Sequence, residues 1–183
     1  MQLPSREECM RILSEHQVPE NVIGHSIAVN RVSVFLAKRL KEKGEDVDVG
    51  LVDAASLLHD LDKIETLKEG VHGVEAKRIL DVLGYPALGT IVQHHKVSFI
   101  DDLKTWEEKI VNYADKRCTN TEIVSLEERF DYLQKRYGHN YEVKNEEQRL
   151  SIKEKFFKLE QEIFSFLSFP PEKLREMVEA GQG

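Results

Sequence analysis

The 183-residue chain contains little cysteine and no long apolar run. Cys9 and Cys118 lie far apart and form no CxxC pair, which argues against a disulfide framework and against a zinc site built from thiolates. No apolar stretch approaches the roughly 20 residues that a membrane-spanning helix needs. The N-terminus also lacks the charged and apolar regions of a secretion signal, so we expect a cytoplasmic protein with no membrane partner.

The charge balance argues against another class of protein. The sequence has 33 acidic and 26 basic side chains, excluding histidine, and a formal net charge of −7. Binding along a nucleic-acid backbone needs clustered Lys and Arg that displace counterions, so we expect no broad nucleic-acid binding. A small local basic pocket is still compatible with this balance. Hydrophobic residues at 40% and charged residues at 32% are typical of a globular protein.

Helix signals recur along the chain, and no run of strict alternation is long enough to predict a strand. A Ser or Thr followed three residues later by Glu predicts helix starts at Ser5 and Thr105, and Asp48 opens another helix. Gly44 and Gly84 are expected just beyond helix ends. We therefore predict an all-α fold, with helices over residues 6–16, 20–41, 49–60, 74–84, 87–95, 106–118, 122–138 and 145–168 and a last short helix after Pro171.

The character of the chain changes near Thr121, where long, charge-rich amphipathic helices begin. No linker rich in Ser, Gly or Pro separates the two parts. We predict a core over residues 1–120 and a helical extension over residues 121–183 that packs on it, with a break between its long helices at Gly138 and Asn140. The extension is expected to close over a site or to form the face of a homodimer, and the sequence does not distinguish these.

His and Asp residues stand beside apolar stripes on four of the predicted helices. Five of the six histidines that follow the first helix lie between positions 25 and 95. The residues concerned are His25, His59 with Asp60, the pair His94 and His95, and Asp115. Each alone also fits an ordinary core or helix-end residue, but together they would converge if the helices pack. Buried charges need a partner or an ion, and imidazole with carboxylate suits zinc, manganese, iron or nickel.

This ordered set resembles the signature of the HD-domain superfamily of metal-dependent phosphohydrolases, and more narrowly its HDIG-type members. The resemblance covers roughly residues 22–120, and "HDLDK" stands where the family commonly has "HDIGK". It implies an all-α HD-domain helical bundle that binds a divalent transition metal. The ligands of the first ion would be His25, His59, Asp60 and Asp115.

Family members with two metals place further histidines between the HD pair and the last Asp. Here "VHGVEA" supplies His72, and "IVQHH" supplies His94 and His95. The resemblance implies that His72 and one or both of the adjacent histidines hold a second ion, with Asp60 bridging the two. It leaves open whether one ion or two are bound, and whether the metal is Fe, Mn, Co, Ni, Zn or Mg.

The resemblance implies hydrolysis of a phosphate ester or anhydride by a metal-activated water that Asp60 orients. The partner would be a small phosphorylated metabolite or a nucleotide. Lys63, about one turn beyond His59, is expected to contact a substrate phosphate and to take part in catalysis. Lys96 and Arg117 are weaker substrate-binding candidates, each within two residues of a predicted ligand. The absence of a GYP signature disfavours a cyclic-dinucleotide phosphodiesterase.

Two other functions stay open, a di-iron oxygenase of the same fold and a non-catalytic ligand-binding HD domain. The intact ligand set counts against the second. Asp62 departs from the family pattern, which usually has Gly there, and it could cap a helix, support a ligand His or repel charged substrates. Five aromatic residues are expected either to belong to the core or to include a base-stacking surface, and the sequence leaves both open: Phe99, Trp106, Tyr113, Tyr132 and Tyr137.

Overall fold

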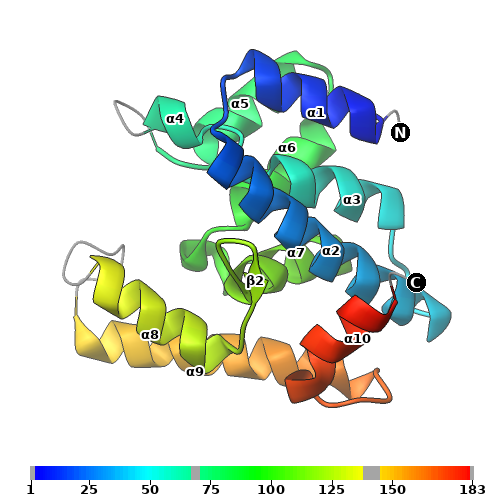
Figure 1. Cartoon of the computed structure of the whole chain (residues 1–183), viewed down its shortest axis with the longest axis vertical. Helices are drawn as coiled ribbons and strands as arrows, with labels where there is room; N and C mark the ends of the chain where they lie inside the picture. The colour runs from blue at the N-terminus through cyan, green and yellow to red at the C-terminus, as the bar shows by residue number, and fades with distance from the viewer. Residues whose placement is uncertain (1–2, 67–70, 138–144, 182–183) are drawn as a thin grey trace.

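A computed structural model describes residues 3–66, 71–137 and 145–181. Within these residues the chain is almost entirely helical, which confirms the predicted all-α class (Figure 1). The elements in chain order are α1 Arg6–Glu15, α2 Glu20–Glu42, α3 Val49–Leu58, α4 Lys63–Thr66, α5 Val74–Val82, α6 Pro86–His94, η1 Val97–Phe99, α7 Trp106–Lys116, β1 Cys118–Thr119, β2 Glu122–Ile123, α8 Leu126–Tyr137, α9 Glu146–Ser165, η3 Pro171–Lys173 and α10 Leu174–Ala180.

The core forms around α2 and α3, which pack along each other and against α7. Helix α3 is apolar nearly all round, and most of its residues, from Leu51 to Leu58, are buried. Helices α5 and α6 form a pair that contacts α3 and α7 through α6. In Figure 1, α1 and α3 to α6 gather at one end of the molecule, whereas α8 and α9 lie across the other. Helix α7 lies between these two ends and contacts both α6 and α9.

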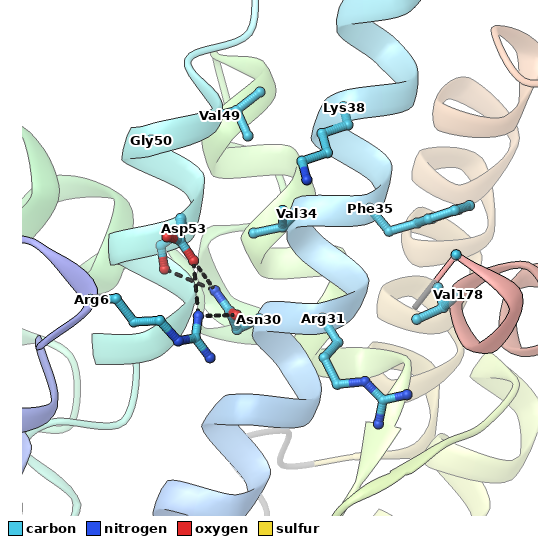
Figure 2. Close-up of a pocket in the computed structure, with 11 residues that line it drawn as sticks. Arg6, Asn30, Arg31, Val34, Phe35, Lys38, Val49, Gly50, Asp53 and Val178 are labelled. Carbon is cyan, nitrogen blue, oxygen red and sulfur yellow. Dashed lines mark hydrogen bonds and ion pairs between the residues drawn. The ribbon is translucent and has the colours of Figure 1, made fainter. Parts of the chain in front are cut away.

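A polar network fixes α2 relative to α3 (Figure 2). The Asn30 amide on α2 donates to Asp53 Oδ1 at 2.6 Å and to Ser56 Oγ at 3.0 Å, both on α3. Arg6 of α1 donates to Asn30 Oδ1 at 2.9 Å. The network lies beside a cavity of about 460 Å³ between α2, α3 and α10. Because α2 carries His25 and α3 leads into His59, these bonds also set the relative position of two candidate site residues.

The three predicted helix starts are confirmed. The Ser5 hydroxyl accepts from the backbone N–H of the third residue of α1 at 3.1 Å, and Asp48 Oδ1 accepts from Leu51 at 3.0 Å. Thr105 and Glu108 form a complete capping box at the start of α7. Each satisfies a backbone donor that has no partner inside its helix.

The segment that joins α7 to α8 differs from the prediction. The helix expected to continue to residue 118 ends at Lys116, and the helix expected from residue 122 begins at Leu126. Between them β1 and β2 pair antiparallel, and Asn120 adopts a positive φ of 51° in the turn. The Ser125 hydroxyl accepts from Glu128 N at 3.2 Å, and Glu128 Oε2 accepts from Ser125 N at 2.8 Å. This Ser and Glu pair is the start signal that decides where α8 begins.

Helices α9 and α10 belong to the same hydrophobic core as α2 and α3, through residues such as Phe156, Ile163 and Leu174. Figure 1 shows α10 returning beside the C-terminal half of α2. The predicted break at Gly138 and Asn140 lies outside the described residues. Over the described part of the chain, every helix is too short or too polar to cross a lipid bilayer.

Candidate metal centre

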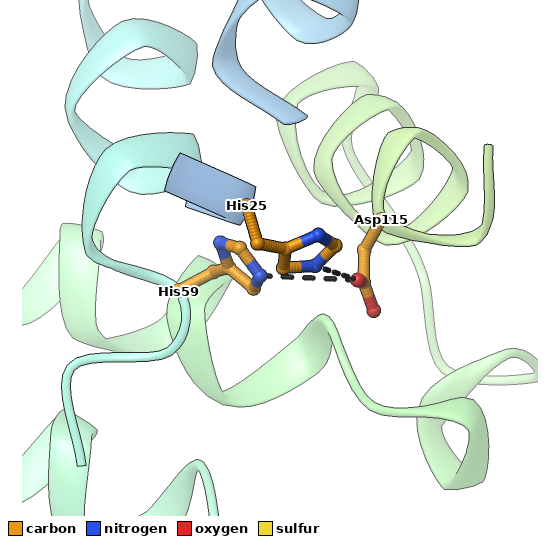
Figure 3. Close-up of side chains that lie close together, drawn as sticks. All are labelled: His25, His59 and Asp115. Carbon is orange, nitrogen blue, oxygen red and sulfur yellow. Dashed lines mark hydrogen bonds and ion pairs between the residues drawn. The ribbon is translucent and has the colours of Figure 1, made fainter. Parts of the chain in front are cut away.

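Two groups of metal-ligating side chains lie where α2, α3, α5, α6 and α7 converge. Within each group, one ligand atom of every member lies within 4.8 Å of those of the others. The first group contains His25, His59 and Asp115 and is drawn in Figure 3, and the second contains Asp60, His72 and His95. All of these residues were predicted from the sequence, and the structure brings them together from segments up to 90 residues apart in the chain.

The first group is centred on the carboxylate of Asp115. His25 Nε2 lies 3.0 Å from Asp115 Oδ1, and His59 Nε2 lies 3.8 Å from the same oxygen (Figure 3). The opposite nitrogens are held by backbone carbonyls, His25 Nδ1 donating to Asn120 at 2.9 Å and His59 Nδ1 to Ser56 at 2.8 Å. A carbonyl can only accept, so Nδ1 carries the proton in each neutral ring and Nε2 keeps its lone pair. Both rings are thus oriented as metal-ligating histidines are.

The second group repeats this arrangement. His72 Nε2 lies 3.0 Å from Asp60 Oδ1 and 3.1 Å from His95 Nε2. His95 Nδ1 donates to the backbone carbonyl of Val92, in the preceding turn of α6. The two Nε2 atoms therefore point into one small space beside a carboxylate oxygen.

Asp60 lies between the two groups. Its Oδ1 faces His72, and its Oδ2 lies 3.8 Å from His59 Nε2 in the first group. Lys63 Nζ lies 3.2 Å from Asp60 Oδ1. This placement is compatible with the bridging role that the resemblance implies, which stays a prediction.

The contacts of Asp62 explain why this position departs from the family pattern. The side chain is fully buried, and Oδ1 accepts from His72 Nδ1 at 2.6 Å. Oδ2 accepts from the backbone N–H groups of Gly73 at 2.6 Å and Ala76 at 3.0 Å, which are among the unpaired donors at the start of α5. Asp62 is therefore both a helix cap and the support of a candidate ligand. Both oxygens are used in this way, so the alternative of a group that repels substrate is not supported.

The structure distinguishes the two adjacent histidines. His94 Nδ1 lies 3.0 Å from Glu108 Oε1, and its ring stacks on Phe99 with the centroids 4.6 Å apart. Glu108 is the same residue that closes the capping box of α7, so His94 is tied to that helix start. Neighbouring side chains at a helix end point in different directions, and only His95 points into the group. The sequence left open which of the two histidines is the ligand, and the structure places His95 and not His94 in the group.

The surroundings of both carboxylates at the centre favour their ionised form. Burial raises the pKa of Asp60, but the hydrogen bond with His72 and the ammonium of Lys63 outweigh this and hold it well below its usual value. Burial acts on Asp115 in the same way, and the ammonium of Lys116 does most to hold its pKa well below the ordinary range. The site therefore offers anionic oxygen donors in a buried setting.

The histidines differ in their electrostatics. Burial lowers the pKa of His59 and lowers that of His95 well below its usual value, which favours the neutral ring that binds metals. Burial also acts to lower the pKa of His72, but hydrogen bonds with Asp60 and Asp62 raise it to about 9. Metal binding at His72 near neutral pH would therefore release a proton.

One buried atom shows that these residues fit a metal. His59 Nε2 is inaccessible to solvent and has no hydrogen-bond partner among the described residues. Leaving such a group unpaired costs about 1–3 kcal/mol, so a native structure normally satisfies it. Imidazole and carboxylate groups without thiolates suit a divalent cation. The two groups are compatible with a divalent metal.

A cavity of about 390 Å³ opens onto both groups. Five cationic side chains help to line it, namely Lys63, Lys96, Lys116, Arg129 and Arg136. The first two were predicted substrate-binding residues, and the structure places them in the cavity wall. The other three were not predicted from the sequence. The signal was available for α8, where Arg129, Tyr132, Leu133 and Arg136 follow helical spacing.

Arg117 does not line this cavity. Its guanidinium is buried, with Nη1 lying 2.8 Å from Glu160 Oε2 and Nη2 donating to the carbonyl of Pro171 at 3.1 Å. Its Nε donates to Val124 at 2.6 Å. The residue ties α7 to α9 and to the start of η3. The prediction that it binds substrate, based only on its nearness to Asp115 in the chain, is corrected.

A helical bundle that assembles two groups of His and Asp side chains defines a class of proteins whose buried site is compatible with a divalent metal. Comparison with known families agrees with this class. The family model described as HD domain matches residues 22–120, and the chain belongs to this family, which is typical of metal-dependent hydrolases. The HDIG subtype stays a prediction.

A related protein extends the similarity beyond the HD segment. The chain is 33% identical over 151 residues to the protein named Uncharacterized protein MJ0778 of Methanocaldococcus jannaschii. The aligned region covers 74% of this chain and 88% of that protein. No solved structure matches the chain.

Proposed function

We propose that the protein is a metal-dependent phosphohydrolase that cleaves a phosphate ester or anhydride bond in a small phosphorylated metabolite or a nucleotide. The observation that carries the proposal is the pair of buried His and Asp groups, joined by Asp60, at the base of a cavity lined by cations. Membership of the HD domain family supports the hydrolase class.

The two groups would each hold a divalent ion. The first would use His25, His59 and Asp115, the second His72 and His95, and Asp60 would contribute to both. Ions bound there polarise a phosphoryl oxygen and lower the pKa of a water toward neutrality.

The protein's own side chains then supply positioning and charge. The surroundings of Asp60 favour its ionised form, which can accept a hydrogen bond from the attacking water. Lys63, with a side chain that is 41% exposed, reaches from Asp60 into the cavity and can hold a phosphate oxygen there. Lys96, which also lines the cavity, adds positive charge. Because the Nδ1 bonds already fix the rings, little reorganisation is needed when substrate binds.

The cysteines do not offer a competing nucleophile. Both Cys9 and Cys118 are buried. Burial raises the pKa of each thiol to about 12, with smaller contributions from Asp53 and Asp115 respectively. A thiolate is therefore scarce at neutral pH, which supports hydrolysis by water.

The test combines metal analysis with a substrate screen. Protein purified without chelator is analysed for bound metals and assayed for phosphate release from monoesters, diesters and anhydrides with manganese, cobalt, iron or magnesium. We expect one or two ions per chain and metal-dependent hydrolysis. His59→Ala should lose both metal and activity, whereas His94→Gln, at the position next to His95 but outside the metal groups, should keep both.

Other results would contradict the proposal in different ways. Oxygen consumption by the iron-loaded protein without phosphate release would identify the di-iron oxygenase alternative. A protein that binds no metal and turns over none of the compounds would identify the non-catalytic ligand-binding alternative.

A further inference from the structure

Helix α8 forms one wall of the candidate active site although it lies outside residues 22–120. It contributes Arg129, Tyr132, Leu133 and Arg136 to the lining of the cavity. These positions are three, four and seven residues apart, so they share one face of the helix. This part of the cavity wall is therefore contributed by the extension and not by the HD segment.

Arg129 connects this wall to the metal groups. Its side chain is 12% exposed, and Nη2 lies 3.7 Å from Asp115 Oδ1. Its Nε is buried and has no hydrogen-bond partner among the residues that the structure describes. A guanidinium has five donors in a planar fork, so Arg129 keeps hydrogen-bonding capacity beyond its pairing with Asp115.

Tyr132 holds both arginines of this wall. The Cζ atoms of Arg129 and Arg136 lie 5.8 Å and 5.6 Å from the centre of its ring, and Arg136 also donates to its hydroxyl. Contacts of this kind reduce the side-chain freedom that a long arginine loses on binding a ligand. With two guanidiniums against its ring, Tyr132 serves to position cations and is poorly placed to stack on a base.

The cavity is lined by more cationic side chains than are needed to bind one phosphate group. Lys63 already lies 3.2 Å from Asp60, and Lys116 contacts Asp115. These two ammonium groups are thus next to the metal groups, where the scissile phosphate is proposed to bind. The cavity of about 390 Å³ is of the size that accommodates a small molecule much larger than a phosphate ion. The arginines of α8 add further positive charge to the cavity wall, in a chain whose net charge is −7.

We infer that the substrate carries a second phosphate group, which Arg129 and Arg136 bind while the first lies at the metal groups. This inference rests on the proposed function. Arginine matches the geometry of a phosphate, because its fork donates two parallel hydrogen bonds to two oxygens. The preferred compounds are thus bisphosphates or diphosphates, and α8 is the element that selects them.

The kinetic test compares pairs of compounds that differ by one phosphate, such as a hexose monophosphate and the matching bisphosphate. We expect a higher kcat/KM for the bisphosphate. Arg136→Gln should raise KM for the bisphosphate by about 10-fold or more, the usual worth of a hydrogen bond to a charged group, and should change the monophosphate little. Arg136 is exposed, so this variant is expected to fold, which circular dichroism checks.

The matched control is Lys135→Gln. It removes the same charge from the neighbouring position of the same helix, and Lys135 does not line the cavity. We expect it to leave KM for both compounds unchanged. An equal effect of the two variants would mean that α8 acts only through its overall charge, and would overturn the inference.

A binding measurement separates this inference from the proposed function. Calorimetry with methylenediphosphonate and with inorganic phosphate needs no turnover, and we expect tighter binding of the diphosphonate in the unmodified chain but not in Arg136→Gln. If no phosphate compound is hydrolysed, the proposed function fails while the diphosphonate preference can still be measured. If hydrolysis occurs but mono- and bisphosphates are bound and cleaved alike, the inference fails and the proposed function stands.

Discussion

Asp62 performs two tasks with one buried carboxylate. It accepts from His72 on one oxygen and from the start of α5 on the other. Asp62→Asn has the same shape, but an amide has only one acceptor oxygen, so one of the two tasks is lost. We expect the affinity of the second group for its ion to fall by about 10–100-fold, as for other residues that support a ligand histidine.

Metal titration of the Asp62→Asn protein would check this expectation. The ion at the first group should be retained, because His25 and His59 are held by backbone carbonyls. Asp81→Asn is a suitable control, since Asp81 is an exposed carboxylate on α5 that pairs only with Lys77 among the ion pairs of the described residues. Equal weakening of both ions would contradict the assigned role of Asp62.

At the scale of single residues, the spacing of His and Asp along the chain predicted which residues form the site. It did not predict how their side chains are arranged. The His and Asp candidates were recognisable because each stood beside an apolar stripe, which requires burial. The sequence did not distinguish His94 from His95 as the ligand, because that choice depends on which residue, distant in the chain, each ring contacts. His94 meets Glu108 and His95 meets His72, and neither contact is encoded within its own helix.

The contact between α7 and α9 offers a comparison of a buried and an exposed ion pair. Glu160→Gln would leave Arg117 as an unpaired buried charge, and we expect a loss of about 3–5 kcal/mol in the free energy of unfolding. Glu162→Gln removes the exposed pair with Lys109 between the same two helices and should cost less than about 1 kcal/mol.

Urea unfolding of the two variants would measure both losses. Matching losses would show that the buried Arg117 and Glu160 pair contributes no more than its exposed neighbour. A smaller loss for Glu160→Gln than for Glu162→Gln would contradict the structural role assigned to Arg117.

The elements that the sequence predicted are those whose start signals are local. Ser5, Asp48 and Thr105 each cap a helix within three residues, so the pattern is visible in a short window. The hairpin of β1 and β2 was missed, because strands of two residues are too short to show alternation and their pairing is a tertiary contact. The four-residue helix α4 was missed because it is too short to show a helical period.

For the whole molecule, we expect metal removal to destabilise the fold. The candidate ligands come from α2, α7, the turn after α3, the segment before α5 and the C-terminal end of α6, so bound ions would cross-link most of the core. At a metal concentration of 1,000 times Kd, binding contributes about 4 kcal/mol. In a chain of this size that corresponds to a decrease in Tm of about 8–16 °C on chelation.

Scanning calorimetry with and without chelator would measure this decrease, and added metal should restore the original Tm. His59→Ala should show little response to chelator. An unchanged Tm of the unmodified protein after its ions have been removed would contradict the cross-linking role of the centre.

Because Asp62 accepts hydrogen bonds from backbone amides at the start of α5, hydrogen exchange of these amides can report on the candidate metal centre. The amides of Gly73 and Ala76 donate to the same carboxylate that orients His72. Loss of an ion from His72 loosens that carboxylate, and the two amides then open to solvent more often. Their hydrogen-exchange rates would thus report occupancy of the second group, including by ions such as zinc and magnesium that have no spectroscopic signal of their own.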